Sequence, residues 1–484
     1  MVSRENVAAI KIVGVGAAGA SFALSLWLLF SFDTANPDMQ FVQMFHWVPA
    51  LHINYLLGVD GISLWMVMLT AFLGLIAIMF SFTQKEGLRN FVALMLALEA
   101  GTLGVFLALD TILFYVFWEL MLVPTYFLIG IWGEGRRVYA TMKFVIYTLV
   151  GSLLMLVAIL SLTMVHYGAT HEVTFDLRVL TLTHIDPSMQ TWMFLFFFLA
   201  FAIKVPVFPL HSWLPHTYAA CPIPTLILLT GAMSKTGAYG FLRFCLPLFP
   251  EAVESFAMVI GLMAAAGMVY GAWIAIAQKD LKALVAYASI SHLGFIVIGI
   301  FANNGTGIEG SLLQMVNHGI IASALFLIVA FIEVRMGTRN LDELRGLSKA
   351  MPVLYGAFML IMLAALGLPG LNGFVGEFLI LMGVWTSSMF SGLSGILVLM
   401  GGLSIVFASI YMLYMFQGSM QGKSDNQGLT DIDRCEFKLL LPACLLIIFI
   451  GLYPKPFIDR VTPSVDALLH LEKTVNLHTE ESGH

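Results

Sequence analysis

Four ionisable side chains interrupt long apolar stretches of this sequence: Glu119, Lys204, Lys235 and Glu377. Each stretch is long enough to cross a lipid bilayer, and a charge at bilayer depth costs several kcal/mol unless it is paired, hydrated or neutralised. Carboxylates and lysines in such surroundings can bind and release protons as neighbouring charges change. The four residues therefore predict a line of titratable sites, and the chemistry that suits such a line is proton transfer.

Two histidines could extend this line. His292 lies in Ser289-Ile-Ser-His-Leu-Gly294 and His318 in Asn317-His-Gly319, on consecutive predicted spans. Imidazole relays protons near neutral pH, but a membrane histidine can also be a simple hydrogen-bonding residue. Both interpretations stay open for each histidine at this stage.

Further polar residues are weaker candidates. Glu99 lies within a span, where it could assist Glu119 or couple to a neighbour. His211 and His216 follow Lys204 on a proline-rich bend, and no carboxylate accompanies them at metal-ligand spacing. We predict no metal site and expect these two histidines to line a path for protons. Every one of the charged residues could instead be a structural anchor or ion pair.

The composition decides which elements must position these groups. Of 484 residues, 60% are hydrophobic and only 11% are charged, which predicts an all-α protein that crosses the membrane many times. Windows of about 19 residues give about thirteen transmembrane helices. The predicted spans are 10–31, 58–82, 91–109, 111–131, 141–165, 191–210, 223–247, 255–276, 284–301, 309–334, 352–389, 393–416 and 437–453.

Several function classes are disfavoured by the same sequence. There is no basic stripe for nucleic acid, no GxGxxG after a strand and no P-loop. The four cysteines, Cys221, Cys245, Cys435 and Cys444, show no ligand spacing and are interpreted as structural thiols. If the chain is a subunit of a redox enzyme complex, the redox centres are expected in other subunits.

Lysine and arginine positions predict the orientation. With the N-terminus inside, the inner loops hold Lys85, Arg136, Lys279 and Arg339, whereas the outer loops 32–57 and 302–308 hold neither lysine nor arginine. Thirteen spans then place the C-terminus outside, whereas two short spans within 352–389 would place it inside.

Two predicted spans are broken, and the breaks define the expected organisation. Pro206 and Pro209 interrupt the span at Lys204, and Gly367-Leu-Pro-Gly370 interrupts the span before Glu377. Paired broken helices are typical of inverted-repeat transporters with ion sites at the breaks. We predict N-terminal helices with an outer loop over 1–90, repeats over 91–247 and 255–416, and a final helix with a tail over 417–484.

Longer sequence motifs resemble a known family. Over nearly the whole chain, they resemble the antiporter-like subunits of respiratory complex I. Among these subunits, they are most similar to subunit M, the counterpart of mitochondrial NADH dehydrogenase subunit 4. They are Phe117-Trp-Glu-Leu, Ile203-Lys-Val-Pro-Val-Phe-Pro-Leu-His-Ser-Trp-Leu-Pro215, Ser234-Lys-Thr-Gly-Ala-Tyr-Gly-Phe-Leu-Arg-Phe244, Ala288-Ser-Ile-Ser-His-Leu-Gly294, Asn317-His-Gly319 and Gly367-Leu-Pro-Gly-Leu-Asn-Gly-Phe-Val-Gly-Glu-Phe-Leu379.

The resemblance implies a fold and a role. The fold would be two inverted five-helix repeats, each with a broken helix. Glu119 and Lys204 would form an ion pair that opens during turnover, and opening would push a proton from Lys204 to Lys235. His292 and His318 would carry it to Glu377 for release outside. NADH, FMN, iron–sulfur clusters and quinone would bind partner subunits, and L- and N-type subunits would be neighbours in a bacterial inner membrane.

The sequence departs from the family in two places. The family usually has fourteen spans, with one helix before the span at 10–31. The family also often carries Pro-Asp-Ala-His where this chain has Pro215-His-Thr-Tyr218, so a role of that Asp or His cannot be transferred.

Three functions remain under comparison. The first is a proton-translocating subunit of NADH:quinone oxidoreductase. The second is a subunit of a cation/proton antiporter or a membrane-bound hydrogenase, although Glu377 in place of the usual lysine counts against the antiporter. The third is a structural spacer that moves no protons.

Overall fold

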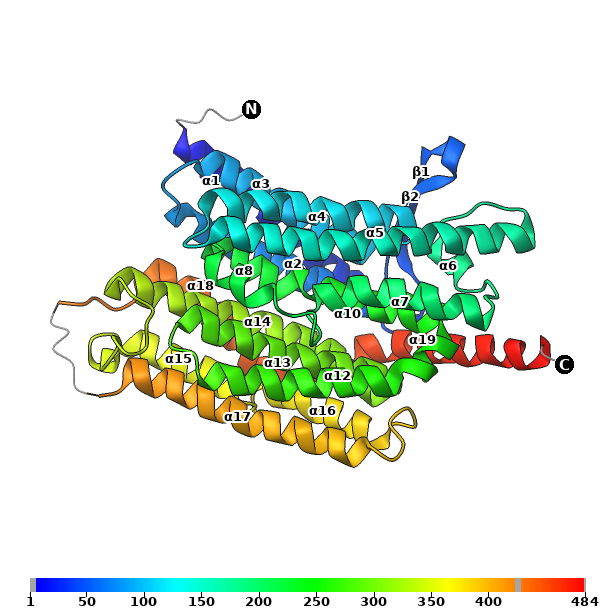
Figure 1. Ribbon diagram of the computed structural model, residues 1–484. Coiled ribbons are helices and arrows are strands. Elements are labelled where there is room, and N and C mark those ends of the chain that lie inside the picture. Colours follow the sequence, from blue (N-terminus) through cyan, green and yellow to red (C-terminus); the bar gives the residue numbers. More distant parts are fainter. Residues whose placement is uncertain (1–5, 423–427, 483–484) are drawn as a thin grey trace.

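The computed structural model describes residues 6–422 and 428–482, and most of these residues are helical. The long helices run side by side across the view in Figure 1. Eleven helices in the described ranges are long and apolar enough to cross a membrane, and two shorter apolar helices accompany them. The chain is therefore a multi-pass membrane protein, as its composition predicts.

The helices follow the predicted spans closely. The continuous ones are α1 (Val7–Ser31), α2 (Gly61–Phe80), α3 (Leu88–Leu107), α4 (Thr111–Trp132), α5 (Arg137–Thr170), α7 (Pro187–Lys204), α12 (Pro250–Ile276), α13 (Leu281–Phe301), α14 (Gly305–Met336), α17 (Ser394–Met420) and α18 (Arg434–Leu452).

Shorter elements lie between them. These are β1 (Gln40–Val48), β2 (Ile53–Val59), α6 (Leu177–Leu180), α8 (Leu214–Ala220) and the 3-10 turns η1 (Pro49–Leu51), η2 (Ser81–Thr83) and η5 (Leu347–Lys349). The strands pair antiparallel, with Tyr55 opposite Phe45. This hairpin occupies much of the predicted outer loop and projects from the bundle at the same end as α6 (Figure 1).

The segment that carries Lys235 is one helix in which α-helical and π-helical turns alternate. It consists of α9 (Ile223–Leu228), the π-helical η3 (Leu229–Met233), α10 (Lys235–Gly240), the π-helical η4 (Phe241–Cys245) and α11 (Leu246–Leu248). A π turn holds an extra residue, and such turns often occur at functional sites. The two π turns flank the block that contains Lys235.

Both predicted breaks are present. α7 ends at Lys204, and the next helix, α8, begins at Leu214. The second broken span consists of α15 (Pro352–Ala365) and α16 (Asn372–Thr386). Between them, Gly367 and Gly370 adopt positive φ angles of 78° and 93°, which glycine tolerates best. The inverted relation between the repeats stays a prediction.

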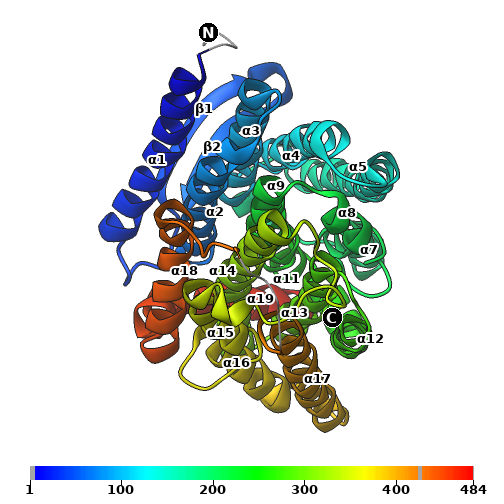
Figure 2. The same cartoon turned by 90° about the vertical axis from the view of Figure 1, so that its left-hand side faces the viewer.

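α14 forms the centre of the bundle. Its apolar window is entirely buried, whereas less than half of the windows of α1, α5 and α17 is buried. Seen end-on, α14 lies amid the other helices and α1, α5 and α17 lie at the edge (Figure 2). Ile12, Phe30 and Leu399 are among the exposed apolar side chains. The exposed faces of these outer helices therefore suit lipid or partner subunits, and the buried centre suits polar side chains that must be shielded.

A helix also follows the last predicted span. α19 (Lys455–Ser482) buries Phe457, Val461, Val465 and Leu468, which recur every three or four residues along one face. This face packs against α2 and α14. The sequence did not predict α19 as a span because its polar residues lower the mean hydropathy.

Candidate functional site

Lys204 lies at the first helix break, where the backbone is held by specific bonds. Pro206 has no N–H to continue the helix. The Val207 N–H donates to the Ala202 carbonyl (2.7 Å), and the Trp213 indole donates to the Ile203 carbonyl (2.8 Å). The Lys204 ammonium is buried, 5.0 Å from the centre of the Trp118 ring. An ammonium over an aromatic face is stabilised, so this site accommodates the charge.

Glu119 is next to Trp118 on α4 and within electrostatic range of Lys204. The two residues form no direct ion pair among the described residues. The Oε1 atom of Glu119 is buried and has no hydrogen-bond partner there. Tyr115, one turn earlier, interacts with the Glu119 carboxylate and with Ser152. The predicted pair is thus close but separated.

Lys235 is the best-connected lysine of the site. Its side chain is fully buried. The Nζ atom lies 2.5 Å from the Thr230 carbonyl, 2.7 Å from His318 Nδ1 and 3.4 Å from Ser234 Oγ. An ammonium offers three donors and no acceptor, so this arrangement suits all three of its hydrogens. His318 then accepts at Nδ1 and carries its own proton at Nε2.

Glu377 and His292 form the other end of the line. The carboxylate accepts a hydrogen bond at Oε1 from His292 Nδ1 (2.9 Å) and another from Gln314 Nε2 (3.3 Å). His292 Nε2 lies 3.3 Å from the Tyr411 hydroxyl. Glu377 and His292 are both buried. A carboxylate bonded to imidazole can exchange a proton with it.

The buried groups form a line with two gaps. Between Lys204 and Ser234 lies a narrow gap, also lined by Phe144 and Trp213, that is too small to hold a water molecule. Between the two histidines, the ring centres are 5.9 Å apart and His318 Nε2 has no partner among the described residues. A side-chain rotation, or a widening that admits water, would complete the line at these gaps.

The second helix break is held by two asparagines. Asn317 Nδ2 donates to the Asn372 carbonyl (2.7 Å), and Asn372 Nδ2 donates to Asn317 Oδ1 (3.1 Å). This pair connects the centre of α14 to the first turn of α16. It fixes Glu377, which lies one turn further along α16, relative to the histidines.

The weaker candidates lie away from the line. Glu99 is buried against Gly74 of α2. His211 stacks between the rings of Phe208 and Tyr270, and its Nδ1 has no hydrogen-bond partner in the described ranges. His216 is exposed beside Tyr139. The described residues bring no three His, Cys, Asp or Glu side chains together as a metal site.

Sequence reasoning missed several members of the site. Gln314 and His318 are four residues apart, so a polar stripe on one helical face would have indicated Gln314. Tyr411 and the Thr230 carbonyl gave no such signal. Lys282 falls between the predicted spans 255–276 and 284–301, yet its side chain is fully buried in the first turn of α13.

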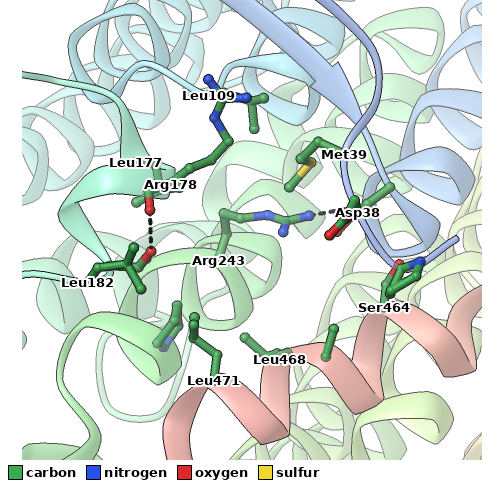
Figure 3. A pocket seen from close by; sticks show the side chains of 15 residues that line it. Asp38, Met39, Leu109, Leu177, Arg178, Leu182, Arg243, Ser464, Leu468 and Leu471 are labelled. Carbon is green, nitrogen blue, oxygen red and sulfur yellow. Dashed lines mark hydrogen bonds and ion pairs between the residues drawn. The ribbon is translucent and has the colours of Figure 1, made fainter. Parts of the chain in front are cut away.

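A cavity that is larger than the gap beside Lys204 lies near the C-terminal end of the helix that carries Lys235. Arg243 reaches across it and donates to Asp60 Oδ1 (2.6 Å), and its Nε donates to the Tyr239 hydroxyl (3.2 Å). Figure 3 shows Arg243 in the middle of this cavity, with Leu468 and Leu471 of α19 along one wall. The ion pair holds α2 to the Lys235 helix near the β-hairpin.

Comparison with known proteins identifies the family. The family model described as "NADH:quinone oxidoreductase/Mrp antiporter, TM" matches residues 108–404, a range that includes all six predicted site residues. The chain belongs to this family. A member from Rhodobacter capsulatus, NADH-quinone oxidoreductase subunit M, is 38% identical over 470 residues, which cover 95% of this chain and 90% of that protein.

Two solved structures share the fold. A chain of respiratory complex I from Thermus thermophilus with bound NADH has 33% identity and a TM-score of 0.87, covering 96% of this chain and 95% of that one. A chain of the Mrp complex from Dietzia has 22% identity and a TM-score of 0.82, covering 98% of this chain and 53% of that one. The second likeness shows the fold alone. The first extends over almost all of both chains.

Proposed function

We propose that this chain is the M-type membrane subunit of an NADH:quinone oxidoreductase and that it translocates protons along the line from Lys204 to Glu377. The observation that carries the proposal is the buried sequence of contacts Lys235–His318 and His292–Glu377. The relatives with high coverage are subunit M proteins, which supports the choice within the family.

The two gaps control when a proton can move along the line. A proton on Lys204 reaches Lys235 only when the void beside Ser234 widens or Lys204 moves into it. Glu119 is close enough to hold the Lys204 charge by attraction. When Glu119 moves closer to or further from Lys204, the ammonium is stabilised or released, so this pair is the switch.

The transfer from Lys235 through the two histidines to Glu377 needs only small movements. When Lys235 gives its proton to His318 Nδ1, the imidazole becomes doubly protonated and can release the proton at Nε2. His292 can pass a proton to Glu377 through Nδ1. Each step leaves the number of protons on the line unchanged until Glu377 releases one.

The proposed setting follows the charge distribution. The loops with Arg136, Lys279 and Arg339 would face the bacterial cytoplasm, and the β-hairpin and the end of α19 would face the periplasm. L- and N-type subunits would be neighbours in the membrane. NADH, FMN, iron–sulfur clusters and quinone would bind to partner subunits.

The alternatives are less well supported. The Mrp likeness is a likeness of fold, and Glu377 replaces the lysine typical of antiporters. A spacer that moves no protons has no need of a buried lysine whose ammonium is shared with a histidine. The proposal therefore favours transport.

The test is Lys235→Met in the native membrane, with Lys438→Met on the exposed part of α18 as the matched control. Inside-out vesicles report NADH oxidation by quinone and proton uptake together, and native gels report assembly. We expect the assembled Lys235→Met complex to lose roughly tenfold or more in both rates, since a positioned proton carrier is worth at least that. Wild-type rates of both NADH oxidation and proton uptake in the assembled Lys235→Met complex would overturn the proposal.

A further inference from the structure

The cavity around Arg243 contains hydrogen-bond donors that the protein does not use. Arg243 Nη2 donates to Asp60 Oδ1 (2.6 Å), and Nε donates to the Tyr239 hydroxyl (3.2 Å). Nη1 makes no hydrogen bond among the described residues, although Arg243 is only 9% exposed. Because the side chain reaches into the cavity, its unused donors face that space (Figure 3). A buried donor without an acceptor costs free energy, so this position favours an acceptor from a ligand.

A second arginine and an unused carboxylate line the same cavity. Arg178 of α6 forms a two-point ion pair with Asp176, through Nε (3.0 Å) and Nη2 (2.6 Å). Its Nη1 makes no hydrogen bond within the described ranges. The exposed Asp38, in the loop before β1, accepts no hydrogen bond at its carboxylate in the described part of the chain. The cavity therefore offers unused donors of two guanidinium groups and an unused carboxylate.

The rest of the cavity wall is largely apolar. Leucines line it from two helices: Leu177 and Leu182 from α6, and Leu468 and Leu471 from α19. The cavity has a volume of about 430 Å³, which is the size of a small-molecule site. Water against leucine side chains is unfavourable, and an apolar chain that replaces this water is stabilised by the hydrophobic effect. Charged groups beside such a wall suit an amphiphile.

The cavity lies at the level where membrane-spanning helices begin and end. α2 begins directly after Asp60, Leu109 lies between the end of α3 and the start of α4, and α12 begins shortly after Pro247. Trp27, near this end of α1, is 56% exposed, as is typical of tryptophan at a membrane interface. Leu182 on α6 is 71% exposed, which suits contact with lipid chains. Phospholipid headgroups lie at this depth.

We propose that this cavity binds a zwitterionic phospholipid whose headgroup carries a phosphate and a primary ammonium. The phosphate accepts from Nη1 of Arg243 and of Arg178, since guanidinium groups match phosphate oxygens in charge and geometry. The ammonium donates to the Asp38 carboxylate, and the acyl chains follow the leucines of α6 and α19. A lipid with a phosphate but no ammonium would leave its negative charge facing Asp38. The proposal does not depend on the transport function proposed above.

The experiment uses the purified whole complex and dioleoylphosphatidylethanolamine that carries a diazirine in one acyl chain. After illumination, mass spectrometry measures the lipid attached to peptides from α6 and from residues 464–471. Leu182→Trp narrows the mouth of the cavity. Leu399→Trp on α17 is the matched control, because Leu399 is 72% exposed and does not line the cavity. Native gels check that each variant assembles.

We expect the lipid to label these peptides in the wild type and in Leu399→Trp. In Leu182→Trp the labelling should fall roughly tenfold, because the blocked cavity loses much of its binding free energy. Equal labelling in the two tryptophan variants would overturn the site, since the label would then come from the surrounding bilayer. If Leu182→Trp does not assemble, Arg178→Gln takes its place, and undiminished labelling in that variant overturns the proposal.

Competition identifies the headgroup. Unlabelled phosphatidylethanolamine should compete better than phosphatidylglycerol, and Asp38→Asn should reduce this preference by roughly two- to fivefold, because one exposed ion pair is lost. Asp459→Asn, exposed on α19, should leave the preference unchanged. Equal competition by phosphatidylglycerol in the wild type would overturn the pairing of the ammonium with Asp38.

Two further results would exclude a lipid as the occupant. If glycerophosphoethanolamine, which lacks acyl chains, competes as well as the lipid, the cavity takes a soluble phosphodiester. If α6 and residues 464–471 carry no label in the intact complex, water or a partner polypeptide fills the cavity. Neither result affects the test of Lys235, which measures NADH oxidation and proton uptake.

Discussion

At the residue scale, the members of the line meet through single atoms: Lys235 Nζ lies 2.7 Å from His318 Nδ1, and Glu377 Oε1 lies 2.9 Å from His292 Nδ1. The buried positions of Lys204, Lys235 and Glu377 follow from charges inside apolar runs, and the structure buries all three. Which atoms meet depends on helix rotation, which a sequence alone does not give. The separation of Glu119 from Lys204 and the burial of Lys282 were accordingly beyond prediction.

The first residue-scale prediction concerns the end of the line. Glu377→Gln keeps an oxygen that can accept from His292 Nδ1 but removes the ability to bind a proton. We expect normal assembly and a loss of roughly tenfold or more in pumping and turnover. Glu343→Gln, in an exposed loop, is the control. Wild-type pumping by Glu377→Gln would show that another group releases the proton.

At the scale of elements, both broken helices were predictable because proline and glycine mark them directly. Pro206 lacks a donor, and Gly367 and Gly370 occupy positive φ. The hairpin of β1 and β2 was not predicted, since its residues alternate too weakly between polar and apolar to distinguish a strand from a loop. The π turns around Lys235 gave no local signal either.

An element-scale prediction follows from a close helix contact. A Cβ at Gly237 would meet the Phe201 carbonyl oxygen at 2.7 Å, in the last turn of α7, where backbone cannot yield easily. Gly402 on α17 has open space instead. We expect Gly237→Ala to reduce assembly or turnover strongly, and Gly402→Ala to be neutral or to stabilise by up to about 1 kcal/mol. Thermal inactivation of the complex measures both, and equal behaviour would contradict the contact.

At the scale of the whole molecule, α19 holds together parts of the fold that are far apart in the sequence. The hydropathy windows did not predict this helix as a span. The Gly61 N–H, at the start of α2, donates to Ser464 Oγ of α19 (2.9 Å), and Thr462 of α19 donates to Glu309 of α14 (2.5 Å). α19 thereby connects α2 to α14. Periodicity of apolar residues would have predicted the helix, but not its contacts.

The whole-molecule prediction tests this closure. Ser464→Ala leaves the buried Gly61 N–H without its acceptor, at a cost of about 1–3 kcal/mol. We expect α19 to be released more often, so limited proteolysis after residue 454 should speed up by roughly tenfold, because cleavage follows the open population. Ser255→Ala, exposed on α12, should leave the cleavage rate unchanged. Equal rates in both variants would mean that α19 is held by its apolar face alone.

The alternation of α and π turns around Lys235 has a mechanical consequence. A π turn stores one surplus residue, and moving that surplus along a helix turns the residues it passes by about 100° without changing the positions of the helix ends. The block Lys235–Gly240 has such a turn on each side. The block can therefore rotate about the helix axis while the helix ends stay in place. Lys235 can then turn from the side of Lys204 to the side of His318, while the ion pair with Asp60 holds Arg243 at the far end.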